Sequence, residues 1–130
     1  MSTDLKYLAF TALLTASLWI PYVVAQVKTN GPLQPANYVD PTQRPLPPWG
    51  KRADRAYLNA IETLAPFAVL VILIHLGGKE SGATAFLAAS FFWLRVAHAI
   101  VFWAAIPYVR TILFTLGYVV VLGLFYELMF

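Results

Sequence analysis

The stretch RAYLNAIETLAPFAVLVILIHLG, residues 55–77, decides the fold. It is mostly apolar and long enough to cross the hydrocarbon core of a membrane, which takes about 20 residues of helix. Three more apolar runs of similar length follow or precede it, at about 5–27, 82–106 and 108–129. The sequence therefore predicts an all-α integral membrane protein, a bundle of four transmembrane helices.

Composition supports this class. Of the 130 residues, 60% are hydrophobic and only 12% are charged, about half the charged fraction of a soluble domain. The four spans occupy most of the chain, so we expect a single domain over residues 1–130. Cysteine is absent, which excludes disulfides, thiolate metal sites and a cysteine nucleophile. Any thiol chemistry must therefore use a thiol that a substrate supplies.

The N-terminal run has a competing interpretation as a cleaved signal peptide. Such a peptide has a basic start, a short apolar core and a small-residue cleavage site. This chain starts with Asp4 and Lys6, and its apolar run is long. We therefore expect a retained helix.

Prolines divide the chain. Pro21 and Pro66 lie inside apolar runs, where each removes a backbone hydrogen bond and predicts a kink. Several more prolines lie between Val27 and Pro48, which predicts an extended connection rather than a helix or a core strand. This is the only long loop, and long loops in compact proteins are often functional.

Basic residues concentrate in this first loop and just after it, and another, Arg110, lies near the connection before the fourth span. Those assigned to the loop are Lys28, Arg44, Lys51, Arg52 and Arg55. Basic loops favour the cytoplasmic side. We therefore expect the first loop in the cytoplasm and both termini outside. The net charge of +3 is spread out, so we expect no nucleic-acid partner. Two distant histidines make no metal site.

Polar residues within the spans share helix faces. Arg55, Asn59 and Glu62 are spaced by four and then three residues, so they lie on one helix face. Arg95, His98 and Phe102 are spaced by three and then four residues and also share a face. Arg95 lies near the bilayer midplane, where a lipid-facing charge costs at least ~2.5–3.5 kcal/mol. Its side chain must therefore face the bundle interior, a cavity or a partner.

Glu62 is the one acidic residue well inside the spans, so we expect it to pair with Arg95 or to share a ligand with it. An ion pair that only fixes helix register is the alternative. Because Arg55, Arg95 and Arg110 meet one carboxylate, an anionic ligand would restore the charge balance. His98 alone is more often a hydrogen-bonding group than a ligand.

The segment Arg55-Ala56-Tyr57-Leu58-Asn59-Ala60-Ile61-Glu62 resembles the Arg-Ala-x-x-Asn-x-x-Glu signature of the MAPEG superfamily, membrane-associated proteins of eicosanoid and glutathione metabolism. Arg95-Val96-Ala97-His98, with Arg110 downstream, is similar to the corresponding segment of microsomal prostaglandin E synthase. The architectural resemblance covers nearly the whole chain, and the specific motifs cover about thirty residues in two helices.

This resemblance implies a homotrimer that holds glutathione between neighbouring subunits and acts on a lipophilic small molecule within membrane lipid. Arg110 would be catalytic as the partner of the glutathione thiolate. The residues that match glutathione contacts are Arg55, Asn59, Glu62, Arg95 and His98.

Two positions depart from the family pattern. Phe102 replaces a tyrosine that family members commonly have, and Lys28 is the only basic residue where catalytic members use an arginine at the end of the first helix. The departures favour a general glutathione transferase or peroxidase over eicosanoid synthesis. The alternatives are a non-catalytic protein of the same fold that binds lipid or a partner subunit, and, third, a small proton-coupled multidrug transporter.

Overall fold

The computed structural model describes residues 1–34, 36 and 45–130, and all regular structure in these residues is helical. The helices are α1 (Thr3–Ser17), α2 (Trp19–Asn30), α3 (Pro48–Leu76), α4 (Gly82–Trp103) and α5 (Pro107–Met129). Four helical spans are long and apolar enough to cross a membrane, and α1 with α2 forms the first. The predicted four-span membrane bundle is thus confirmed.

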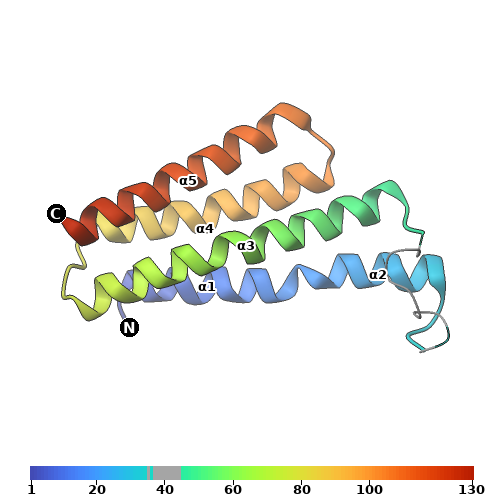
Figure 1. Cartoon of the computed structure of the whole chain (residues 1–130), viewed down its shortest axis with the longest axis horizontal. Coiled ribbons are helices and arrows are strands. Elements are labelled where there is room, and N and C mark those ends of the chain that lie inside the picture. The colour runs from blue at the N-terminus through green and yellow to red at the C-terminus, as the bar shows by residue number, and fades with distance from the viewer. Residues whose placement is uncertain (35, 37–44) are drawn as a thin grey trace.

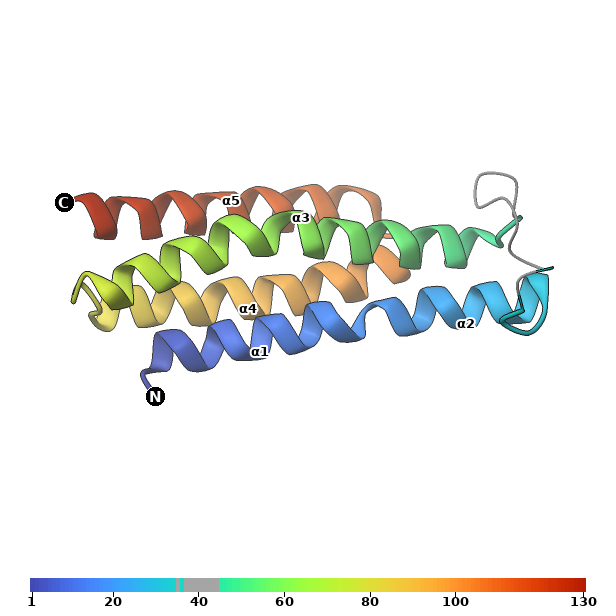
Figure 2. The same ribbon diagram turned by 60° about the horizontal axis from the view of Figure 1, so that its bottom comes forward.

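The spans pack side by side with α3 and α4 between α1 and α5, and both termini lie at the same end of the bundle (Figures 1 and 2). The helix α2 packs on the first half of α3, where Ala25 and Gly50 are both buried. A Cβ atom added to Gly50 would lie 2.8 Å from the Ala25 Cβ atom. Glycine therefore permits this close approach.

The first span differs from the expected single helix with a kink at Pro21. It is interrupted at Leu18, whose N–H group donates to the Leu14 and Thr15 carbonyl oxygens at 3.1 and 3.3 Å. Pro21 has no N–H group to donate to the Ser17 carbonyl, and its ring crowds that carbonyl. The interruption therefore lies one turn before the proline.

The second span begins at Pro48, seven residues before the apolar run that starts at 55. Proline is well suited to the first helical position because the N–H group it lacks would have no intrahelical partner there. Pro66 lies inside α3, which continues through it to Leu76, and the kink expected there stays a prediction. The rest of the predicted extended connection includes residue 35 and residues 37–44, which lie outside the described residues.

The third span ends at Trp103, three residues earlier than expected. Pro107 forces the preceding Ile106 into an extended conformation, so α4 must close before it. Ala105 closes the helix with a left-handed φ of 59°. The Ile106 N–H donates to the Val101 carbonyl and the Ala105 N–H to the Phe102 carbonyl, each at 3.2 Å, which is a Schellman motif.

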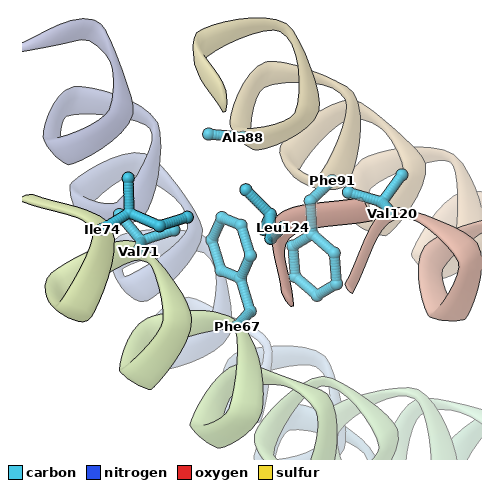
Figure 3. Close-up of a cluster of buried hydrophobic side chains, with 7 residues drawn as sticks. All are labelled: Phe67, Val71, Ile74, Ala88, Phe91, Val120 and Leu124. Atoms are coloured by element: carbon cyan, nitrogen blue, oxygen red, sulfur yellow. The ribbon is translucent and has the colours of Figure 1, made fainter. Parts of the chain in front are cut away.

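The larger of the two buried hydrophobic clusters among the described residues lies in the half of the bundle near the termini. It consists of buried side chains from α3, α4 and α5 (Figure 3). Phe67 and Phe91 stack with their ring centroids 4.0 Å apart and their planes 12° apart. The cluster comprises Phe67, Val71, Ile74, Ala88, Phe91, Val120 and Leu124.

Candidate functional site

A polar groove lies between α3, α4 and α5 at the end of the bundle opposite the termini. It consists of two adjoining hollows of about 250 and 400 Å³ that share Asn59, Phe102 and Arg110. The residues that line it are Lys51, Arg52, Arg55, Asn59, His98, Phe102, Arg110, Thr111 and Phe114.

Helical spacing places these side chains on one side of each helix. The first three turns of α3 supply the basic residues and Asn59, and the last turns of α4 supply His98 and Phe102. The first two turns of α5 supply Arg110 and Thr111. Because the turn after Trp103 is tight, the end of α4 and the start of α5 both border the groove.

The electrostatic character of the groove is strongly positive. Among the described residues, its lining contains the four cations Lys51, Arg52, Arg55 and Arg110 and no carboxylate. The Arg52 Nε–H donates to the Trp103 carbonyl oxygen at 3.3 Å, which ties α3 to the end of α4. The Arg110 guanidinium lies over the Phe102 ring, 5.1 Å from its centroid. An anion fits this lining.

An apolar cavity of about 180 Å³ adjoins the groove, and Phe114 lines both. Its charged lining residues are Glu62 and Arg95, Thr63 and Tyr118 carry hydroxyl groups, and its remaining described lining is apolar. The full lining is Glu62, Thr63, Pro66, Phe91, Arg95, Phe114, Gly117, Tyr118 and Val121.

Arg95 and His98 connect the two spaces. Arg95 is 5% exposed and His98 is 2% exposed. Arg95 Nη2 lies 3.4 Å from His98 Nδ1, and because a guanidinium only donates, His98 Nδ1 is the acceptor. The Arg95 Nε–H is buried and has no hydrogen-bond partner among the residues that the structure describes.

The sequence of the chain is similar to one known protein family. The MAPEG family profile matches residues 5–130. The chain belongs to the MAPEG family. No curated protein and no solved structure matches it. The match covers essentially the whole chain, including every residue of the groove and the cavity. This MAPEG chain is therefore a membrane protein of the kind that acts in eicosanoid and glutathione metabolism.

The site residues predicted from the sequence all border one of these two spaces. Arg55, Asn59, His98 and Arg110 line the groove, and Glu62 and Arg95 line the cavity. The two faces expected on α3 and α4 thus converge in the MAPEG chain.

Glu62 and Arg95 do not form the expected ion pair in the described part of the chain. Both residues line the apolar cavity, but the only ion pair within the described ranges is that of His75 with Glu80, at 3.0 Å. Glu62 is exposed at the surface of the single chain. The shared-ligand alternative remains a prediction.

Sequence reasoning missed part of the lining. Lys51 and Arg52 were assigned to the loop and to topology, whereas α3 begins early enough to place them in the groove. Gly117 and Phe114 carry no chemical signal of their own. Their role follows only from the packing of α5 on α3 and α4, although their helical spacing from Arg110 gave a weak signal.

Proposed function

We propose that this MAPEG protein binds glutathione in the polar groove and uses its thiolate to attack lipophilic electrophiles or hydroperoxides dissolved in the bilayer. The observation that carries this proposal is a groove whose described lining has four cations and no carboxylate, next to an apolar cavity. Glutathione is an anionic thiol, and the chain itself contains no cysteine.

The dimensions support a tripeptide. An extended chain of three residues spans about 10 Å. Arg55 and Glu62 are seven residues apart on α3, which corresponds to about 10 Å along the helix axis. The two hollows of the groove, about 250 and 400 Å³, are of the size of ordinary small-molecule sites.

Each group of the ligand has a complementary residue. Arg55 offers a forked, charge-assisted pair of donors for a carboxylate. Glu62 lines the adjoining cavity rather than the groove and is exposed at its edge, where its carboxylate would take the ammonium group. Asn59, in the groove, both donates and accepts. Arg95 lines the cavity, and its guanidinium orients the ring of His98, which lines the groove. The tripeptide would contact Arg95 directly only if part of it entered the cavity.

Arg110 is the proposed partner of the thiolate. It lies in the first turns of α5, near a helix N-terminus that also favours negative charge. A cation near the sulfur lowers the pKa of the thiol and raises the fraction of the reactive thiolate. The Phe102 ring beneath the guanidinium fixes its position.

Two reactions follow from a bound thiolate. With an electrophilic carbon, a carbon–sulfur bond forms and the leaving group departs with its electron pair. With a hydroperoxide, sulfur attacks the terminal oxygen, the O–O bond breaks, and the alkoxide takes a proton to give an alcohol. A second glutathione then converts the sulfenic acid to a disulfide and water.

Assembly as a homotrimer belongs to the same proposal. Arg55, Glu62 and Arg110 are exposed in the single chain although they lie in helices of the spans. Charges at such depth face protein or a water-filled cavity rather than lipid. Neighbouring subunits would cover these residues and close the groove, with the first loop on the cytoplasmic side.

The direct test is turnover by the purified protein in proteoliposomes with glutathione and either an aryl halide or a lipid hydroperoxide. We expect product formation that Arg110→Gln reduces strongly. Lys79→Gln removes a cation at the other end of the bundle and serves as the matched control. Glutathione binding without turnover of either substrate would contradict the enzymatic proposal.

One observation favours a second function. Phe102 has no hydroxyl group, and Thr111 provides the one hydroxyl in the described lining of the groove. A non-catalytic MAPEG protein that binds lipid or a partner subunit would need no such group. Binding without turnover in the same assay would support this function, and drug-driven proton release without a glutathione response would support a transporter.

A further inference from the structure

The apolar cavity holds a buried cation that the tripeptide proposal leaves without a counter-charge. Arg95 is 5% exposed and lines this cavity, and its Nε–H group has no hydrogen-bond partner in the described part of the chain. Leaving such a donor unpaired costs free energy, so an unpaired buried donor needs an explanation. A ligand with an acceptor group would supply the missing partner.

The size of the cavity limits this ligand. Its volume is about 180 Å³, and an apolar protein cavity of about 150 Å³ binds benzene. The cavity therefore fits one aromatic ring or a short branched alkyl group, not a whole fatty acyl chain. Glu62, Pro66, Phe114 and Tyr118 are exposed lining residues, so the cavity opens to the surface of the chain.

We propose that the apolar cavity binds an aryl carboxylate, with the ring against the apolar lining that includes Phe91 and Gly117 and the carboxylate on the Arg95 guanidinium. Because the cavity adjoins the groove at Phe114, such a molecule lies next to the proposed thiolate. Its role as a second substrate rests on the proposed function, whereas its binding does not require glutathione.

Glu62 is the competing partner for Arg95. Its carboxylate lines the same cavity, yet among the described residues it forms no ion pair with Arg95. A second apolar hollow on the bundle, of about 540 Å³, provides a comparison because its lining contains no charged residue. That lining consists of Phe86, Leu87, Ser90, Trp93, Leu94, Leu116, Val119 and Val120.

The test uses the full chain in detergent micelles without glutathione. Fluorine NMR measures the affinity of para-(trifluoromethyl)benzoate and of the neutral para-(trifluoromethyl)benzamide. A charge-assisted hydrogen bond predicts that the benzoate binds about tenfold more tightly than the amide. Arg95→Gln should remove this difference while it keeps the affinity for the amide, which shows that the variant is folded.

A second variant tests the place of binding. A Cβ atom added to Gly117 meets only Phe91 Cε2, at 4.0 Å, so Gly117→Leu fills the cavity without a backbone clash. It should weaken both probes about tenfold, since the ring loses its space. Ser90→Leu adds similar bulk to the uncharged hollow and should leave both affinities unchanged.

Three results would overturn the proposal: equal affinity for benzoate and amide, unchanged binding in Gly117→Leu, or competitive displacement of the benzoate by glutathione. The last would assign Arg95 to the tripeptide site itself. A protein that binds the benzoate but no glutathione would support this inference and contradict the proposed function, so the two failures are distinguishable.

Discussion

Arg110 lies where a single guanidinium can control the chemistry of a bound thiol, in the first turns of α5 and over the Phe102 ring. We expect Arg110→Gln to raise the pKa of the glutathione thiol and to lower the turnover rate at neutral pH about tenfold or more. Ultraviolet absorbance of the thiolate across a pH series measures this directly. The proposed role is wrong if the variant and Lys79→Gln give the same thiol pKa.

Phe102 positions that guanidinium. A cation–π contact out of water contributes about 1–2 kcal/mol, so Phe102→Leu should lower kcat/KM about tenfold. Phe102→Tyr keeps the ring and should retain activity. Steady-state kinetics on both variants make the comparison, and an active Phe102→Leu together with an inactive Phe102→Tyr would refute a role for the ring.

At the scale of elements, two helix ends use the same closing motif with different residues. Gly78 closes α3 at a φ of 65°, and Ala105 closes α4 at a φ of 59°. A residue with a Cβ atom in this region costs about 1–2 kcal/mol. We therefore expect Ala105→Gly to stabilise the protein by about 1 kcal/mol.

The measurement is the melting temperature in detergent. Ala104→Gly is the matched control, because Ala104 has right-handed helical angles and glycine there should not stabilise. A lower melting temperature for Ala105→Gly than for the wild type would show that this turn carries no strain.

Glu80 joins three elements at the opposite end of the bundle. It accepts from the Ser2 Oγ hydroxyl at 2.6 Å and lies 3.0 Å from His75 Nδ1. The hydrogen bond from Ser2, then that from His75, lowers the pKa of the Glu80 carboxyl below its ordinary value of 4.5. A lowered carboxyl pKa stabilises the folded state above the ordinary pKa, and this contribution disappears as the pH falls through the lowered one.

Thermal melts between neutral and acidic pH test this contact. The wild type should lose more stability below the ordinary carboxyl pKa than Glu80→Gln does, because the variant has no carboxyl group to protonate there. Superimposable pH profiles for the two proteins would show that the contact does not contribute.

The sequence allowed prediction of the spans and of the two site faces, because length, apolarity and helical spacing determine these locally. Arg55, Asn59, His98 and Arg110 reach the groove for this reason. The break at Leu18 and the short end of α4 are proline effects that act one turn upstream. The apolar cavity was not predictable, since it depends on how the helices pack against one another.

In the molecule as a whole, charged residues of the spans, among them Arg55 and Glu62, lie at the surface of the single chain. Because such charges are costly in lipid, we expect neighbouring subunits to cover them, and the resemblance to the MAPEG superfamily implies that this assembly is a homotrimer. Native mass spectrometry from detergent measures the assembly. A stable, glutathione-binding monomer would contradict the expectation that neighbouring subunits cover these residues.

If the polar groove binds an anionic thiol tripeptide, glutathione must stabilise the folded protein. The measurement is the melting temperature with and without glutathione. At a hundred times its dissociation constant, a ligand stabilises the folded state by about 2.7 kcal/mol. We predict a rise in melting temperature that Arg55→Gln largely removes and Lys79→Gln preserves. No rise in melting temperature at any glutathione concentration, or an equal rise in Arg55→Gln, would contradict binding of glutathione in the polar groove.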